Sequence, residues 1–503
     1  MNMDDLRNIT NLRGIEREAL RIYGDGNLSC SEHPQSLGHK LTNSSITVDF
    51  SENLLEIITK PHKNIDMALY ELTTLSAFTL QSVPEEEFIL NTSMPLSAIE
   101  AQIKEANFGG SNSGRMKQVY RKGLSARYGK IMQIIAGIHY NFSFDKSLIL
   151  RKAIELGISN SDVYFGVINN YFEYMWLLPY LFGSSPICAK TSVKKKPEYL
   201  IDLDEEFYAG EFSTSLRMSD LGYTSPAQKD LSISYYNVKA YVKDMLNATV
   251  TEIEQYKEIG LYDTEGKRIQ LNQSILQIEN EYYSPIRPKQ IGKRGERPAC
   301  ALSNRGVEYI EVRVLDVDLF DKNGISKNTA LFVEAMLMSC LMQEFKGYSQ
   351  RRVDLGKQNL KNVAVQGRKP NLELVDSMGE KITLKEYGLT LFGKIEAVAK
   401  QMGQEYLDAV LFEKQKIFDV SKTPSAKIIK LAKALGYKNL VLKTSKQASD
   451  DFRKVSLTQK EREILFDQVK QSIETEKSLR DNDTISLDEY ISKYYKSVEG
   501  CCY

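Results

Sequence analysis

The sequence predicts an α+β protein: a sheet covered by helices on one face and lining an acidic cleft with the other, followed by a helical C-terminal region. Two observations support this prediction. Several stretches between residues 14 and 315 alternate apolar and polar side chains with the period of two expected for a half-buried strand, and their polar positions hold acids. Beyond about residue 315 the apolar residues recur at helical spacing instead. At 503 residues the chain can bury a large core.

The first alternating stretch is GIEREALRI, residues 14–22. As a strand it places Glu16 and Glu18 on one face, about 7 Å apart. At an effective dielectric constant near 20, this pair costs roughly 2 kcal/mol if both carboxylates stay ionised and nothing bridges them. An exposed edge strand would leave both to water, whereas a cleft would need a bridging cation.

Four further stretches alternate in the same way, and each is expected to be a strand. Their polar positions are Asp49 and Glu56 in 46–59, His139, Asn141 and Ser143 in 137–144, Gln277, Glu279, Glu281 and Tyr283 in 274–285, and Glu311 and Arg313 in 309–315. One such strand says little, but several in one chain predict a sheet with an acidic face. Of Glu279 and Glu281, we expect one or neither to bind a metal.

A cleft with so many acids requires cations, because otherwise several carboxyl pKa values would rise. Oxygen ligands with an occasional imidazole, here His139, suit Mg²⁺ or Mn²⁺ better than zinc. Magnesium clusters commonly serve phosphates, and the chain offers GGSNSGR at 109–115 followed by Lys117, Arg121 and Arg127. Since no G-x-x-x-x-G-K-[ST] loop is present, a triphosphate would be held by metals and arginines. The glycine stretch alone is weak evidence, because most such loops are turns.

The C-terminal helices have start and stop signals. Ser456 and Gln459, and then Ser486 and Glu489, have the spacing of capping boxes, and Gly436 follows an apolar helical pattern where a helix ends. These helices are expected to be amphipathic and to form a packed, solvated layer.

Composition argues against several classes of protein. Lys plus Arg and Asp plus Glu balance at 66 each, so no nucleic-acid or membrane-surface partner is expected. The acidic start MNMDDLRNIT has no apolar segment of a signal peptide, and the longest apolar run, 174–182, is too short to span a bilayer. Six cysteines without C-x-x-C spacing predict a reduced, cytoplasmic protein, with no role assigned to Cys501 or Cys502.

Together these stretches resemble the proteobacterial type of glutamate–cysteine ligase. The blocks that carry the resemblance are GIERE (14–18), ITVDFSENLLEIIT (46–59), SNSGR…YRKGLSARYG (111–129), GIHYNFS (137–143), PYLFGSSP (179–186), TSLRMSDLGY (214–223), LQIENEYYSPIRPK (276–289), GVEYIEVRVLD (306–316) and GRKPNLEL (367–374). They run in order over roughly residues 11 to 375. The family implies a cup-shaped antiparallel sheet of the glutamine-synthetase catalytic type, flanked by helices. It also implies that ATP phosphorylates the γ-carboxylate of glutamate, and that the amine of cysteine then displaces phosphate to give γ-glutamylcysteine, the first step of glutathione biosynthesis.

The resemblance implies roles for individual residues. The metal ligands would be Glu16, Glu18, Asp49, Glu56, His139 and Glu311. Arg121 and Arg313 would neutralise the transferring phosphoryl group, a task suited to a permanently charged planar fork. Arg217 would contact glutamate, and Asn141 would neighbour the metals. The cysteine pocket would consist of Tyr120, Leu124, Gln133, Tyr223 and Tyr283.

The resemblance ends near residue 375, so we expect a catalytic domain at 1–375 with a helical region at 376–503 packed on it. Mg²⁺, with Mn²⁺ as a substitute, would be the cofactor and ATP a co-substrate. The other partners would be L-glutamate and L-cysteine, and the protein is expected to be a monomer in the cytoplasm.

Three other functions compete with this one. A related γ-glutamyl ligase could use a different amine, although the pocket residues argue against it. A glycoside hydrolase also needs paired carboxylates, but it would leave the arginines and His139 unused, and the chain has a single tryptophan for sugar stacking. A non-catalytic nucleotide-binding protein could lose some of the acids, yet every ligand of the family is present.

Overall fold

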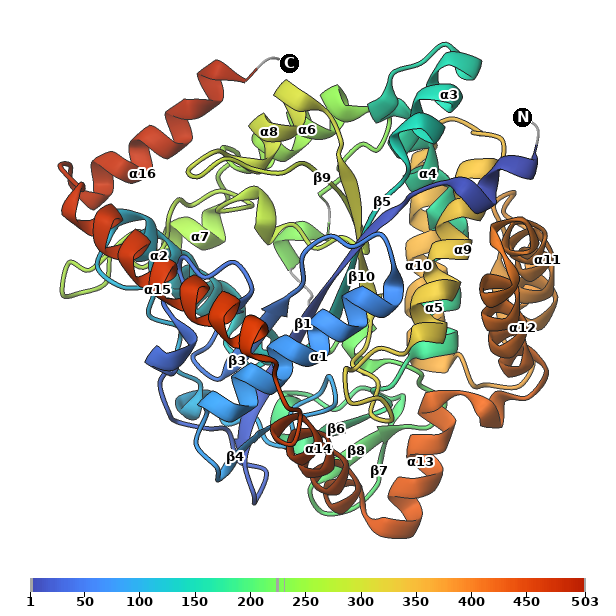
Figure 1. Ribbon diagram of the computed structural model, residues 1–503, viewed down its shortest axis with the longest axis horizontal. Helices are drawn as coiled ribbons and strands as arrows, with labels where there is room; N and C mark the ends of the chain where they lie inside the picture. Colours follow the sequence, from blue (N-terminus) through green and yellow to red (C-terminus); the bar gives the residue numbers. More distant parts are fainter. Residues whose placement is uncertain (1–2, 223–225, 230, 502–503) are drawn as a thin grey trace.

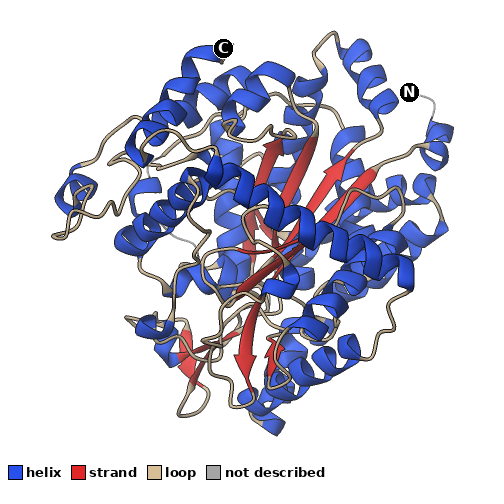
Figure 2. Ribbon diagram, turned by 60° about the vertical axis from the view of Figure 1, so that its left-hand side comes forward, coloured by secondary structure: helices blue, strands red, loops and turns tan. Residues whose placement is uncertain are grey.

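The computed structural model describes residues 3–222, 226–229 and 231–501. It is an α+β protein built around one large antiparallel sheet, whose strands lie in the order β2-β3-β1-β5-β10-β9, with β4 also paired to β1. The bounds of these strands are β1 Leu12–Tyr23, β2 Ile46–Val48, β3 Leu54–Ile58, β4 Glu87–Ile89, β5 Ile138–Ser143, β9 Ile286–Lys289 and β10 Tyr309–Leu315. Helices almost surround these strands (Figure 2).

One face of the sheet packs on helices because its strands alternate as predicted. Ile15 and Ala19 of β1, Tyr140 of β5, and Ile310 and Val312 of β10 are fully buried. Helices that contact this sheet or pack directly behind it include α1 Ile65–Ser82, α4 Asn160–Tyr174, α5 Leu177–Phe182 and α9 Lys327–Met342. Thirteen of the sixteen residues of α9 are buried, so this helix lies in the centre of the core. The opposite face is left for polar residues.

The remaining elements surround this core (Figure 1). Two small sheets consist of β6 Ile187–Ala189, β7 Leu200–Asp202 and β8 Phe207–Gly210, and of β11 Glu373–Val375 and β12 Lys381–Thr383. The other helices that precede the C-terminal region are α2 Asn112–Tyr128, α3 Lys146–Leu156, α6 Val238–Ala248, α7 Glu254–Ile259, α8 Pro298–Arg305 and α10 Gln350–Gln366. The expected domain boundary after residue 375 falls inside the β11–β12 hairpin, a strand pair in a region that the sequence predicts to be mostly helical.

The C-terminal region is helical, as predicted. Its helices are α11 Leu384–Met402, α12 Gln404–Phe418, α13 Pro424–Leu435, α14 Tyr437–Arg453, α15 Gln459–Asp481 and α16 Leu487–Lys496. Gly436 follows α13, and Ser486 with Glu489 forms the predicted capping box of α16. The capping box predicted at Ser456 and Gln459 is wrong: Thr458 and Glu461 form it two residues later. Since several Ser, Thr, Glu and Gln residues follow one another here, their spacing alone fits more than one register.

The predicted strand at 274–285 is also wrong. Glu279–Glu281 form a short 3-10 helix, and irregular chain follows before β9. Glu279 pairs with Arg297 (Oε1–Nε 3.0 Å), whereas Glu281 pairs with Arg127 (Oε1–Nη1 3.2 Å), so the two acids are held by different elements. Alternation with a period of two in a short stretch cannot distinguish a strand from a turn whose acids face separate partners.

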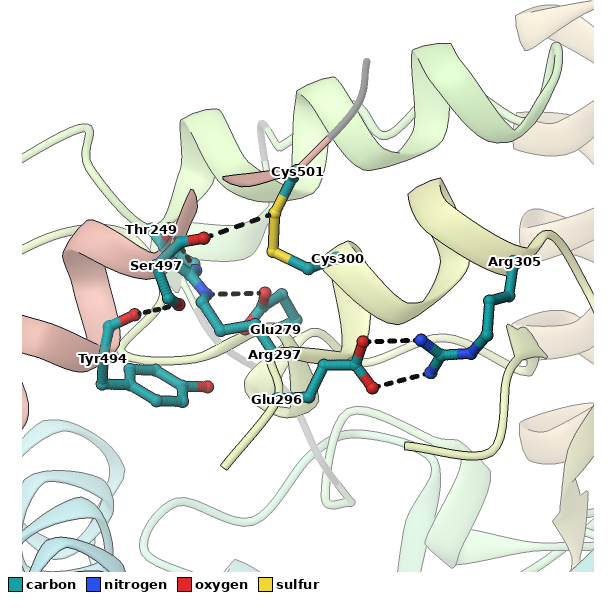
Figure 3. Close-up of a disulfide and its surroundings, with 9 residues drawn as sticks. All are labelled: Thr249, Glu279, Glu296, Arg297, Cys300, Arg305, Tyr494, Ser497 and Cys501. Atoms are coloured by element: carbon teal, nitrogen blue, oxygen red, sulfur yellow. Dashed lines mark hydrogen bonds and ion pairs between the residues drawn. A yellow bond between two sulfur atoms is a disulfide. The ribbon is translucent and has the colours of Figure 1, made fainter. Parts of the chain in front are cut away.

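The prediction of six reduced cysteines fails at one pair. Cys300 of α8 and Cys501 form a disulfide, with their Cα atoms 5.0 Å apart (Figure 3). The two are 201 residues apart in sequence, and Cys501 lies just beyond the last helix of the chain, α16. Cys502 lies outside the described residues. Among the described cysteines, Cys30, Cys188 and Cys340 are free thiols.

No helix in the part of the chain that the structure describes is both long and apolar enough to cross a membrane.

Candidate active site

A cavity of about 330 Å³ opens on the polar face of the large sheet. Its floor comes from β1, β3, β5 and β10, one wall comes from α2, and another from the chain between Ile278 and Lys289. All six predicted metal ligands line it: Glu16, Glu18, Asp49, Glu56, His139 and Glu311. Arg121 and Arg313 line it as well.

Strand register brings these acids together. Within the antiparallel sheet Glu18 of β1 lies opposite Glu56 of β3, and Glu16 lies opposite His139 of β5. Glu311 of β10 lies opposite Asn141, on the far side of β5 from Glu16. Cross-strand neighbours lie about 4.5–5.5 Å apart, so like charges placed this way repel unless a cation intervenes. The acids therefore cluster because side chains alternate along each strand and because the register of the strands sets these positions side by side.

The His139 ring lies at the centre of the cluster. Its Nδ1 is 3.2 Å from Glu16 Oε2 and 3.9 Å from Glu311 Oε1, while its Nε2 is 3.6 Å from Glu18 Oε1. Asn141 lies two residues after His139 on β5. Its Nδ2 donates a 2.7 Å hydrogen bond to Glu16 Oε1, and this bond orients the Glu16 carboxylate. Asn141 itself does not line the cavity.

The residues present fit a divalent metal ion. Glu16, His139 and Glu311 can each offer one ligand atom, all within 4.8 Å of one another. Glu311 Oε2 is buried and has no hydrogen-bond partner among the described residues, although its Oε1 contacts Arg313 (Nη1, 3.1 Å). A buried carboxylate oxygen without a partner is costly, and a metal would satisfy it. Carboxylate oxygens with one imidazole suit Mg²⁺ or Mn²⁺.

Electrostatics divide the acids into two groups. Burial, reinforced by the charges of Asp49 and Glu16, holds the pKa of Glu56 well above its ordinary value. Burial raises the pKa of Glu18 as well, although the His139 ring opposes that rise.

The other group behaves oppositely. Burial works to raise the pKa of Glu311, but the charges of Lys289 and Arg313 outweigh it and hold this pKa well below its ordinary value. Burial also works to raise the pKa of Glu16, but the hydrogen bond with His139 helps to turn the shift downward.

Arginines on both sides of the cavity supply fixed positive charge. Arg121 of α2 donates through Nε to the Asp49 carbonyl (2.5 Å) and packs its guanidinium over the Phe108 ring. Arg313 of β10 lies 3.4 Å from His139 Nδ1 through its Nη1. A planar fork with several donors can hold the oxygens of a phosphoryl group.

The small pocket predicted for a thiol lies in the same cavity. Tyr120 and Leu124 come from α2, Gln133 follows in the 3-10 helix Ile131–Ile134, and Tyr283 comes from the chain before β9. Tyr223 lies outside the described residues. The four described members therefore converge from segments up to 163 positions apart, between Tyr120 and Tyr283.

Arg217 does not line the cavity. Its side chain is 2 % exposed, and its Nη2 donates to the backbone carbonyl of Arg313 (3.0 Å). The guanidinium lies behind the wall that Arg313 presents to the cavity. It is close enough for its charge to lower the pKa of Glu18, against the larger effect of burial.

Only part of the stretch expected to hold phosphate reaches the cavity. Lys117 and Arg121 line the cavity, but Arg115 does not, and Arg127 is bound to Gln270 and Glu281. The loop at 109–115 begins α2 and meets the C-terminal region, since Asn112 Nδ2 donates to the Ile485 carbonyl (2.9 Å).

Two cationic residues that were not among the predicted site residues, Arg287 and Lys289 of β9, also line the cavity. Lys289 Nζ lies 3.4 Å from Glu311 Oε1. Their alternation in IRPK was a signal that could have found them, because it places both on one face of a strand. Glu281 also lines the cavity, but Arg127 and the Tyr128 hydroxyl already bind its Oε1. Glu279 faces away, toward Arg297.

Carboxylates that fit a divalent metal, lying beside arginines in one cavity, are typical of enzymes that transfer phosphoryl groups. The family model for glutamate-cysteine ligase matches residues 2–363. Glutamate–cysteine ligases from Saccharophagus degradans and Pseudomonas putida are each 38 % identical to the chain, covering 98 % and 97 % of it and 95 % of each relative. The chain belongs to the glutamate–cysteine ligase family.

Two solved structures are similar to this chain. A crystal structure of glutamate–cysteine ligase from Francisella tularensis in complex with AMP is 65 % identical, with a TM-score of 0.97 over 99 % of both chains. A bifunctional glutathione synthetase from Pasteurella multocida has a TM-score of 0.71 at 24 % identity, over 90 % of this chain and 53 % of that one. At that identity the second match shows a shared fold alone.

Proposed function

We propose that this protein joins L-glutamate to L-cysteine at the expense of ATP, in the cavity on the polar face of the large sheet. The observation that carries the proposal is the convergence of five acids and one imidazole, two arginines and a small tyrosine-rich pocket in one cavity. Family membership supports it, and the AMP bound to the Francisella relative supports a nucleotide site.

The reaction has two steps. An oxygen of the glutamate γ-carboxylate attacks the γ-phosphorus of ATP, the bond to the bridging oxygen breaks, and ADP leaves. The cysteine amine then attacks the acyl carbon of γ-glutamyl phosphate, loses a proton, and expels phosphate as the amide forms. Negative charge builds on the phosphoryl oxygens in the first step and on the acyl oxygen in the second.

Each residue has a proposed role. Arg121 and Arg313, on opposite sides of the cavity, donate to the transferring phosphoryl group. Glu16, Glu18, Asp49, Glu56, His139 and Glu311 would hold Mg²⁺, or Mn²⁺ in its place. Bound there, the metal would neutralise the triphosphate and polarise its oxygens. The buried, unpartnered Glu311 Oε2 supports this assignment.

Substrate contacts follow from position. Tyr120, Leu124, Gln133 and Tyr283 would surround the cysteine side chain, and Tyr223 is assigned to the same pocket by sequence. Arg217 would attract the charge of glutamate from behind Arg313, while Asn141 orients Glu16. A pocket of apolar walls and phenol hydroxyls can accept a thiol without ionising it.

The organisation of the chain is also a proposal. We assign catalysis to residues 1–375 and a supporting role to 376–503, on a sheet of the glutamine-synthetase cup type. The cavity on one face of an antiparallel sheet supports the cup. We also assign the protein to the cytoplasm as a monomer. The balance of 66 basic and 66 acidic residues supports the absence of a nucleic-acid or membrane-surface partner.

One assay tests the function. Purified protein with Mg-ATP, glutamate and cysteine should release ADP and form γ-glutamylcysteine, and omission of either amino acid should abolish coupled ADP release. Alanine, glycine and serine as amines should react far more slowly. Equal rates with these amines would favour the alternative, a γ-glutamyl ligase for a different amine, and no ADP release with any amine would refute the ligase.

A further inference from the structure

Gly137 lies directly before β5, where it contacts a predicted metal ligand through its backbone. Its N–H donates to Glu18 Oε2 (2.7 Å), and its carbonyl accepts from the Glu18 N–H (3.0 Å). Glu18 is thus held to Gly137 by its side chain and its main chain at once. This ring of two hydrogen bonds fixes the direction in which the Glu18 carboxylate enters the cavity.

The guanidinium of Arg217 occupies the space that a side chain of Gly137 would fill. A Cβ atom added to Gly137 would lie 2.5 Å from Cζ and 2.7 Å from Nε of Arg217, and closer still to Nη2. Cβ atoms in proteins essentially never come within 3.0 Å of another group in this way. The backbone of Gly137 does not have a positive φ, so alanine would be excluded by this contact and not by conformation.

Arg217 cannot move aside without losing its other contacts. Its Nη2 donates to the Arg313 carbonyl (3.0 Å), and its Nη1 lies 3.9 Å from Asp316 Oδ1. The pairing of β5 with β10 changes register between Val312 and Leu315, so the Arg313 carbonyl lies in an irregular stretch of the strand. A donor from outside the sheet meets that carbonyl, and the donor is Arg217.

We propose that Gly137 is a positioning residue that sets the relative placement of three charged groups. Its amide aims Glu18, and its lack of a side chain admits Arg217, which in turn supports Arg313 through the carbonyl of the irregular stretch. The inference rests on the proposed function, in which Glu18 binds metal, Arg313 stabilises the phosphoryl group and Arg217 attracts glutamate. Errors of about 1 Å in such a constellation typically cost on the order of 10²-fold in rate.

The test compares Gly137→Ala with Gly14→Ala. Gly14 is a buried glycine of the neighbouring strand, and a Cβ there would meet its nearest atoms at 3.6–3.7 Å, an ordinary contact. We expect Gly137→Ala to lower kcat/KM for glutamate by about 10²-fold. The KM for glutamate should rise at least about tenfold while the KM for ATP changes less than about twofold, and Gly14→Ala should stay within about twofold of wild type.

A double-mutant cycle isolates the cause. In an Arg217→Ala background the clash is absent, so Gly137→Ala should lower kcat/KM by less than about twofold further. If Arg217→Ala does not fold, Arg217→Lys, which lacks the guanidinium, takes its place. The melting temperature of every variant is measured in parallel, so that a variant that does not fold is recognised.

These experiments distinguish the positioning role of Gly137 from the proposed role of Arg217 in binding glutamate. Equal losses from Gly137→Ala in the presence and absence of the Arg217 guanidinium would overturn the positioning role. So would a Gly137→Ala enzyme with wild-type KM for glutamate and wild-type kcat. If instead Arg217→Ala leaves the KM for glutamate unchanged, the proposed role of Arg217 is wrong, whatever Gly137→Ala does.

Discussion

The two sides of the acidic cluster differ in how the protein itself neutralises them. Toward β10 and β9, Glu311 meets Arg313 at 3.1 Å and Lys289 at 3.4 Å, and its pKa is lowered. Toward β3, burial and the charges of Asp49, Glu16 and Glu18 raise the pKa of Glu56, and the charge of Lys117 opposes this rise without cancelling it. The fold therefore neutralises one side in advance and leaves the other dependent on cations that arrive with the substrates.

The largest effects should come from removing a carboxylate on either side. Glu56→Gln and Glu311→Gln should each lower kcat on the order of 10³-fold, because a lost ligand removes several kcal/mol of charge stabilisation. ADP release at limiting Mg²⁺ measures this. Glu308→Gln, whose carboxylate pairs with Lys146 away from the cavity, is the matched control and should be near wild type. Near-normal turnover of both ligand variants at limiting Mg²⁺ would refute the ligand assignment.

A smaller effect should follow from changing the cation on the neutralised side. Arg313→Lys keeps the charge but loses the fork, so two parallel hydrogen bonds become at best one. Losing one preorganised donor costs about 3–4 kcal/mol in the barrier, so kcat should fall about 10²- to 10³-fold. The KM values for ATP and glutamate should change modestly, and the melting temperature should stay near that of wild type. Turnover within about fivefold of wild type would make Arg313 a structural partner of Glu311 only.

The pocket beside the cluster should affect binding and leave the phosphoryl chemistry largely intact. Tyr283→Ala should raise the KM for cysteine about 10- to 200-fold, the range expected when an apolar pocket loses a group worth 1–3 kcal/mol. The KM for ATP should remain nearly unchanged. Tyr282→Phe is the control, because Tyr282 is buried and does not line the cavity. A parallel rise in the KM for ATP would show that the whole site had been disturbed.

The smallest effect should appear in the stability of the metal-free protein, with opposite signs on the two sides. Glu56→Gln relieves repulsion and should raise the melting temperature by about 1 °C. Glu311→Gln removes the carboxylate that pairs with Arg313 and Lys289 and should lower it by about 3–5 °C. Melting curves in a chelating buffer test this prediction. Melting-temperature shifts of the same sign in both variants would contradict the proposed difference between the two sides of the cluster.

The difference between the two sides of the cluster should also affect how the stability of the metal-free protein depends on pH. A carboxyl group with a raised pKa binds more protons in the folded state, so its stability contribution is present below the unfolded pKa near 4.3 and is lost as pH rises through the folded pKa. Metal-free wild type should therefore lose part of its stability between about pH 4.3 and the folded pKa of Glu56. Glu56→Gln should show a smaller loss over the same window.

Much of the site could be predicted because a strand has a fixed period. Alternation alone placed Glu16 with Glu18, and Glu311 with Arg313, on single faces, and both strands form as expected. The same rule failed at 274–285, where Glu279 and Glu281 turn toward Arg297 and Arg127. Periodicity describes the preferences of one segment, and these two acids were placed by partners far away in sequence. The alternation in IRPK places Arg287 and Lys289 on one face of β9, but only the pairing of β9 with β10 shows that Lys289 lies beside Glu311.

The sequence by itself therefore determined the class of fold, the faces of β1, β5 and β10, the family, and the kinds of residue that the chemistry needs. Only the tertiary structure decided which faces meet: the register that sets Glu18 against Glu56, the contact of Arg217 with Gly137, and the disulfide between Cys300 and Cys501. The physical reason is distance along the chain. Backbone period and side-chain polarity are local properties, whereas these pairs join residues 38 (Glu18 and Glu56) to 201 (Cys300 and Cys501) positions apart and depend on how all the elements pack at once.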